Sequence, residues 1–67
     1  MTFTLSEPYI ELYKLIKLLD LVDTGGQAKM VIEAGHVFRN KAVETRTRAK
    51  IIKGDTITIG DVVIEVI

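Results

Sequence analysis

The spacing of the apolar residues changes at Gly35, and this change most limits the folds open to the chain. Before Gly35 the apolar residues recur every three or four positions, which indicates amphipathic helices, and after it they alternate with polar residues, which indicates strands. This order predicts an α+β domain, in which two helices pack on a small, mainly antiparallel sheet. Because the chain has 67 residues and no cysteine, we expect residues 1–67 to form a single domain without disulfide support.

Two helices are expected before Gly35. The first should run from about residue 8 to residue 20, since proline at position 8 suits a first helical turn and the apolar residues that follow share one stripe. The second should begin at Thr24-Gly25-Gly26-Gln27, which has the form of a capping box. In that motif the Thr and Gln side chains each satisfy a free backbone amide. Gly35 is then placed just after the end of the second helix, where a left-handed conformation suits glycine.

Short strands and tight turns are expected in the rest of the chain. Asn40-Lys41 and Gly60-Asp61 each join two runs of alternating polarity, as two-residue hairpin loops do. The expected strands are residues 2–5, 36–39, 42–44, 56–59 and 62–67.

The charges of the chain are unevenly distributed, although they sum to zero. Residues 36–53 hold six basic residues and one acidic residue, a balance of +5, whereas the segments before and after them balance −2 and −3. Such polarity favours a nucleic acid or another acidic partner more than the net charge does.

The basic residues are densest between positions 44 and 50. If this segment is extended, Glu44, Arg46, Arg48 and Lys50 share one face, with the cations spaced by about 6.6 Å. A phosphate backbone could follow such a row. Two alternatives remain open: an ordinary solvated strand face whose charge prevents edge pairing, or a surface that docks an acidic protein, which would make the chain a protein-interaction adaptor.

Other chemistries find little support in the sequence. His36 is the single histidine and has no cysteine or carboxylate at a ligand-like spacing, so we expect no metal site, although the ring could stack on a base or meet a phosphate. Gly25-Gly26 matches neither phosphate-loop pattern, and no nucleophile and base are paired, so we expect no cofactor and no catalysis. Without an export signal or a membrane-length apolar run, the protein is expected to be cytoplasmic, with no membrane partner.

The run GGQAKMVIEAGHVFRNKAVETR resembles the signature region of S4 RNA-binding domains. The sequences at 26–29 and 44–46 are similar to those of the small single-domain bacterial YbcJ-like proteins, and the resemblance covers almost the whole chain. It implies an αL motif, in which two helices and the following turn bind structured RNA, often ribosomal RNA. The positions that match the pattern are Ala28, Ile32, Gly35, Val37 and Asn40.

The resemblance also implies where RNA would bind. Thr24 stands where many S4 domains have Ser, but Gly25 stands where many have Arg, and Lys41 replaces the usual glycine after Asn40. The first departure removes a phosphate contact and the second adds a cation, so the contacts should shift toward residues 39–53. Such contacts favour RNA structure over RNA sequence. The predicted RNA-binding residues are Thr24, Gln27, Lys29, Arg39, Asn40, Lys41, Arg46, Arg48, Lys50 and Lys53.

Overall fold

Five strands form one sheet in the computed structural model, which describes residues 1–67. Strand β1 pairs in parallel with β7, and every other pair in this sheet is antiparallel. Strands β2 (Ile10–Glu11) and β5 (Lys50–Ile51) form a separate antiparallel pair. The order across the large sheet is β1 (Thr2–Phe3), β7 (Val62–Val66), β6 (Thr56–Ile59), β3 (Val37–Arg39) and β4 (Ala42–Val43).

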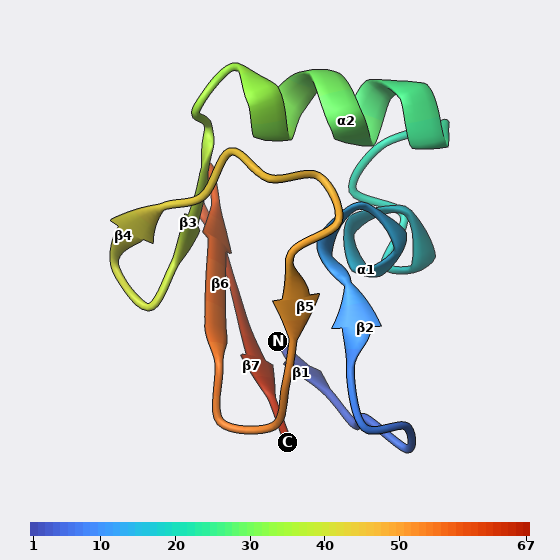
Figure 1. Ribbon diagram of the computed structural model, residues 1–67, viewed down its shortest axis with the longest axis vertical. Helices are drawn as coiled ribbons and strands as arrows, with labels where there is room; N and C mark the ends of the chain where they lie inside the picture. Colours follow the sequence, from blue (N-terminus) through green and yellow to red (C-terminus); the bar gives the residue numbers. More distant parts are fainter.

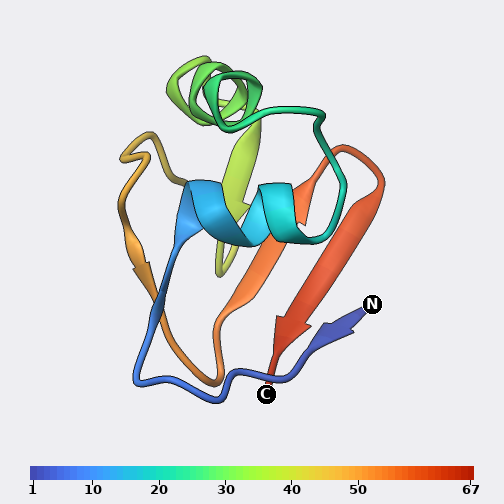
Figure 2. The same ribbon diagram turned by 90° about the vertical axis from the view of Figure 1, so that its right-hand side faces the viewer.

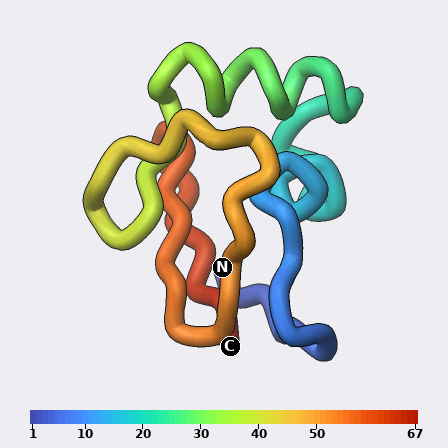
Figure 3. Tube along the Cα trace, in the orientation of Figure 1, coloured from blue at the N-terminus to red at the C-terminus, as the bar shows by residue number.

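Two helices complete the fold. Helix α1 (Leu12–Leu18) crosses one face of the sheet, and helix α2 (Gly25–Glu33) lies over one end of it (Figures 1 and 2). The C-terminus lies at the opposite end of the sheet (Figure 3), and the N-terminus lies beside β7. The predicted α+β class with two helices on a mainly antiparallel sheet is confirmed. Neither helix is long and apolar enough to cross a membrane.

The core lies between α1, α2 and one face of the sheet. Alternation along β7 buries Ile64 and Val66 and leaves Val63 and Glu65 exposed, as expected for a sheet with one solvated face. The stripe predicted on the first helix buries Leu12, Leu15 and Ile16. The core cluster consists of Leu5, Leu12, Leu15, Ile16, Ala28, Ile32, Val37, Ala49, Ile51, Ile57, Ile64 and Val66.

The first helix begins four residues later than the sequence predicts. Residues 10–11 are extended and pair with residues 50–51, so the helix starts at Leu12 and not at residue 8. The amides of Leu12 and Tyr13 donate to the carbonyls of Ala49 and Thr47, at 2.9 and 3.0 Å. Because these first-turn amides have no partner within a helix, the tertiary contact takes the place of the expected proline start.

Both helices end in the same hydrogen-bonded arrangement. In α2, Gly35 (φ +84°) donates to the carbonyl of Ile32 and His36 donates to that of Val31, the two bonds of a Schellman motif. The predicted role of Gly35 is confirmed. In α1, Asp20 and Leu21 make the equivalent bonds to Lys17 and Ile16. Asp20 therefore occupies the left-handed position, with φ +58°.

The turns of the two hairpins agree with the sequence. Asn40 and Lys41 both have positive φ, at 51° and 72°, the pattern of a type I′ turn. In the second hairpin Gly60 alone has positive φ, at 58°. The strands are mostly shorter than predicted, since β1 ends at Phe3 and β4 ends at Val43.

The hydroxyl of Thr24 should contribute measurably to stability, because it accepts a hydrogen bond from the amide of Gln27 at 3.1 Å. Thr24→Ala is expected to lower the free energy of unfolding by about 1 kcal/mol, whereas Thr24→Ser, which keeps the hydroxyl, should stay close to the native value. Urea denaturation of the three proteins measures the difference. Equal stability of the Ala and Ser variants would contradict a capping role.

Candidate nucleic-acid interface

Residues 44–50, called the basic loop from here on, do not form the continuous extended segment that would align their cations on one face, and only Lys50, the first residue of β5, lies in a strand. A turn interrupts them, closed by a hydrogen bond of 3.2 Å from the Ala49 amide to the Arg46 carbonyl. The carbonyls of Thr47 and Ala49 are used by the first turn of α1, so the backbone cannot also continue a strand ladder there. The side chains of Arg46, Arg48 and Lys50 are nevertheless all exposed.

An open hollow of about 660 Å³ lies between the basic loop and the end of α2. Four of its lining side chains carry positive charge and one, Glu33, carries negative charge, so its electrostatic potential favours an anion. Figure 1 shows the loop running beside α2 before it enters β5. The lining residues are Glu33, Arg39, Thr45, Arg46, Thr47, Arg48, Ala49 and Lys50.

One buried carboxylate, that of Asp55, organises the wall of this hollow. Its Oδ2 accepts hydrogen bonds from Arg39 Nε at 3.1 Å, from Arg39 Nη2 at 2.9 Å and from the Ile52 amide at 2.9 Å. Its Oδ1 accepts from Asn40 Nδ2 at 2.9 Å. Burial alone would raise the pKa of Asp55, but these hydrogen bonds outweigh it and hold the pKa below its ordinary value. The carboxylate is therefore charged and fully coordinated.

Arg39 and Asn40 also bind backbone groups on neighbouring segments. Arg39 Nη2 donates to the Lys50 carbonyl at 2.8 Å, and Asn40 Oδ1 accepts from the Thr56 amide at 2.9 Å. The sequence suggests both residues as RNA contacts. The structure gives them a structural role, because their polar atoms tie the β3–β4 hairpin to β5 and β6.

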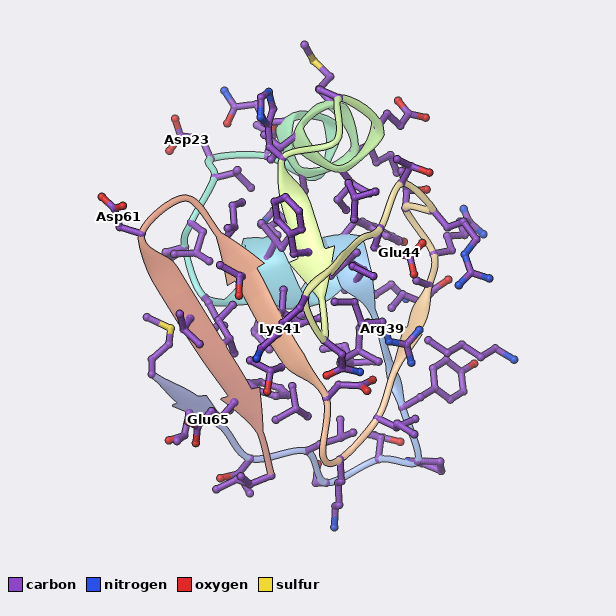
Figure 4. The ribbon with its side chains drawn as sticks, turned by 90° about the vertical axis from the view of Figure 1, so that its left-hand side faces the viewer. Asp23, Arg39, Lys41, Glu44, Asp61 and Glu65 are labelled. Atoms are coloured by element: carbon purple, nitrogen blue, oxygen red, sulfur yellow. The ribbon has the colours of Figure 1, made fainter.

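A second carboxylate, Glu44, holds Arg46. Its oxygens accept from Arg46 Nε at 3.0 Å, from Nη2 at 3.1 Å and from the amide at 3.2 Å. These bonds from Arg46 hold the pKa of Glu44 below its ordinary value, against the opposing effect of burial, and raise the pKa of Arg46. Figure 4 shows Glu44 and Arg39 on the same side of the molecule, with Arg39 Nη1 3.9 Å from Glu44 Oε1. Arg46 stays 73% exposed, but Glu44 offsets much of its charge.

Three other cations keep their charge free for a ligand. Arg48, Lys50 and Lys29 form no ion pair with a carboxylate within 4.0 Å. The ammonium groups of Lys50 and Lys29 each lie 5.0 Å from the centre of a tyrosine ring, those of Tyr9 and Tyr13. Such cation–π contacts orient a lysine without neutralising it.

The other predicted contacts lie outside the hollow. Thr24 caps α2, and Gln27 Oε1 accepts from the Asp23 amide at 2.8 Å. Lys41 is at the tip of the β3–β4 hairpin (Figure 4), and neither it nor Lys53 lines the hollow. The structure therefore gathers only Arg39, Arg46, Arg48 and Lys50 of the ten predicted residues around one hollow.

Sequence reasoning missed the residues that hold these cations in place. Asp55 lies just before the expected strand at residues 56–59, and nothing in the sequence pairs it with Arg39. Glu44 was expected on the same strand face as Arg46, but not as the carboxylate that binds its guanidinium. A usable signal existed for Asp55, since a short polar residue after Gly54 is typical of a turn whose carboxylate binds nearby backbone amides.

Comparison with known proteins places this geometry in context. The family model of the S4 domain matches residues 3–67. The Escherichia coli protein YbcJ and the Shigella flexneri protein YbcJ are each 40% identical to the chain, over 98% of this chain and 96% of theirs. The solution structure of Escherichia coli YbcJ matches with a TM-score of 0.75, over 98% of this chain and 85% of that one. It is described as revealing an αL motif involved in RNA binding.

The Asp55 contacts should make stability depend on acidity. Because the pKa of Asp55 is lower in the folded state than in the unfolded chain, its contribution is present above about pH 4 and is lost as the pH falls through the folded-state value. Asp55→Asn should cost roughly 2–4 kcal/mol near pH 7, since it removes the nearer counter-charge of Arg39 and leaves only Glu44, at 3.9 Å. The same variant should lose less stability on acidification than the native protein.

Urea denaturation at a series of pH values from 7 to 3 measures both effects. Asp61→Asn is the matched control, because Asp61 is exposed in the β6–β7 turn and should change stability by less than about 0.5 kcal/mol. An Asp55→Asn protein as stable as the control would contradict the organising role of the carboxylate.

Proposed function

The chain belongs to the S4 domain family, and we propose that it is a single RNA-binding domain that holds structured RNA in the hollow beside the basic loop. The observation that carries the proposal is the set of cations gathered around this hollow, with Arg48 and Lys50 free of acidic partners. Lys29 reaches the same side of α2 through its contact with the Tyr13 ring. RNA phosphates are the ligand, because their spacing along a backbone matches several separate cations better than a single small anion does.

Recognition of RNA shape follows from the kind of groups presented. Arg and Lys side chains bind phosphates in any sequence, and double-stranded RNA offers mainly phosphates and 2′-hydroxyls to a protein surface. Thr45 and Thr47 also line the hollow, and a threonine hydroxyl can donate to or accept from a 2′-hydroxyl. We therefore propose a preference for a folded RNA over a single strand, with ribosomal RNA as the target class that the S4 resemblance favours.

The proposed activity is binding without catalysis. The cationic groups around the hollow are guanidinium and ammonium ions, which offer hydrogen-bond donors but no acceptor, and Glu44 raises the pKa of Arg46. Such groups hold phosphates but do not act as general bases. The proposal places the protein in the cytoplasm, where ribosomal RNA is found.

Reversal of one free charge tests the proposal. Arg48→Glu should weaken binding to a structured RNA hairpin by about tenfold near 0.1 M salt, because it removes one phosphate contact and adds repulsion. Lys17→Glu makes the same charge change on an exposed residue of α1 that does not line the hollow, and should weaken binding less than about twofold. Fluorescence anisotropy with the hairpin, a single strand and a DNA duplex measures these affinities.

Salt dependence gives a second measurement. With about four phosphates contacted, log K should fall with log salt with a slope of roughly −3 to −4, and Arg48→Glu should make the slope less steep by about one unit. Equal effects of Arg48→Glu and Lys17→Glu would show that only net charge matters and would contradict a defined site. Binding to polyglutamate as tight as to the hairpin would favour the alternative, an adaptor for acidic proteins.

A further inference from the structure

A second hollow, of about 410 Å³, lies along the segment that joins the two helices. It is called the acidic groove from here on. Figure 2 shows α2 end on, with this connecting segment on one side of the helix and the basic loop on the other. The groove is lined by Asp20, Leu21, Val22, Asp23, Gln27, Met30 and Val31.

Helix α2 separates two surfaces of opposite charge. Glu33 lines the basic hollow, and Lys29 lies one turn before it, whereas Gln27, Met30 and Val31 line the acidic groove. The two hollows share no residue. Because the charged residues of the groove are both carboxylates, RNA would be repelled from it, and the groove is not an extension of the proposed RNA surface.

The composition of the groove fits a ligand that is both apolar and basic. Leu21, Val22 and Val31 give it an apolar lining, and Met30 lies at the surface, 70% exposed. A flexible, exposed methionine adapts to varied apolar partners. Asp20 and Asp23 form no ion pair with any Lys or Arg of the chain, so their charges remain available.

Local stability does not explain the acid at position 20. Asp20 follows the C-terminus of α1, where the helix dipole disfavours negative charge, and it has the left-handed backbone that α2 gives to Gly35. Glycine or asparagine would suit this position better. Asp23, by contrast, precedes the N-terminus of α2, where an acid is favourable. A residue that lowers the stability of the fold is expected where it contributes to binding.

We propose that the acidic groove binds a basic segment of another protein. An apolar side chain of that segment contacts Met30 and the apolar lining, and its Lys or Arg side chains pair with Asp20 and Asp23. The chain would then hold RNA on one side of α2 and a protein on the other. This inference does not depend on the RNA proposal, since the two surfaces have separate residues and opposite charges.

The test uses the ¹⁵N-labelled full chain and a synthetic peptide in which Leu alternates with Lys and Arg. Amide shifts on titration should occur at the groove residues and not in the basic loop. A peptide with Leu replaced by Ser and one with Lys and Arg replaced by Glu should each bind at least about tenfold more weakly. Shifts confined to the basic loop, or none at all, would overturn the proposal.

Two variants separate binding from folding. Asp20→Asn should lower the affinity for the peptide by roughly twofold to fivefold, as loss of one exposed ion pair does. The same variant should raise Tm by about 2–6 °C, because it removes a negative charge from the C-terminus of α1. Met30→Gln should lower the affinity for the peptide severalfold and should keep Tm within about 2 °C of the native value. Unchanged peptide affinity in both variants would rule the groove out.

Two further outcomes would also overturn the proposal. Concentration-dependent shifts of the same groove amides without peptide would identify a second copy of the chain as the occupant. Shifts of these amides on addition of an RNA hairpin would identify RNA. The RNA affinity of Asp20→Asn and Met30→Gln should remain native, so failure here and failure of the RNA proposal give different results.

Discussion

The pairing of Asp55 with Arg39 is the interaction on which the rest of the basic surface depends. Four hydrogen bonds converge on this carboxylate, from the β3–β4 hairpin and from the turn before β6. Removal of a charge from water is costly unless its partners replace the lost hydration, and no buried side-chain polar atom here lacks a partner. The same guanidinium also binds the Lys50 carbonyl. One ion pair thus joins three chain segments and fixes the end of the basic loop where it enters β5.

This arrangement divides the basic residues into two kinds. Arg39 serves the fold, and Arg46 is directed by Glu44, whereas Arg48 and Lys50 meet solvent with their charge intact. A count of charges in the sequence treats all of them alike. The balance of +5 over residues 36–53 therefore overstates the positive charge that is available to a ligand. The position of each acidic partner decides which of the cations can bind a ligand. Preorganised side chains lose less entropy on binding than free ones, so Glu44 lowers the charge of Arg46 but also orders it.

The sequence predicts features that depend on local physics and misses those that depend on distant contacts. The cap at Thr24, the left-handed Gly35 and both hairpin turns follow from residues within a few positions of each other, and all are present. The start of α1 depends on carbonyls some 35 residues further along the chain, those of Thr47 and Ala49. No local pattern encodes that contact. The family resemblance predicted the fold, but it could not show that the side-chain amide of Asn40 donates to Asp55, since the two residues are 15 positions apart.

Helix α2 shows how one short helix can separate a basic surface from an acidic surface within a single small fold. Its buried side, with Ala28 and Ile32, faces the core, and the helical period then places Lys29 toward one flank and Val31 toward the other. The basic loop and the connection from α1 cover these flanks with opposite charge. Because both are anchored by backbone hydrogen bonds to α1, a ligand on either flank contacts a surface that is already ordered. Simultaneous binding on both sides then requires no change in the fold, and the two ligands should bind independently unless they touch each other.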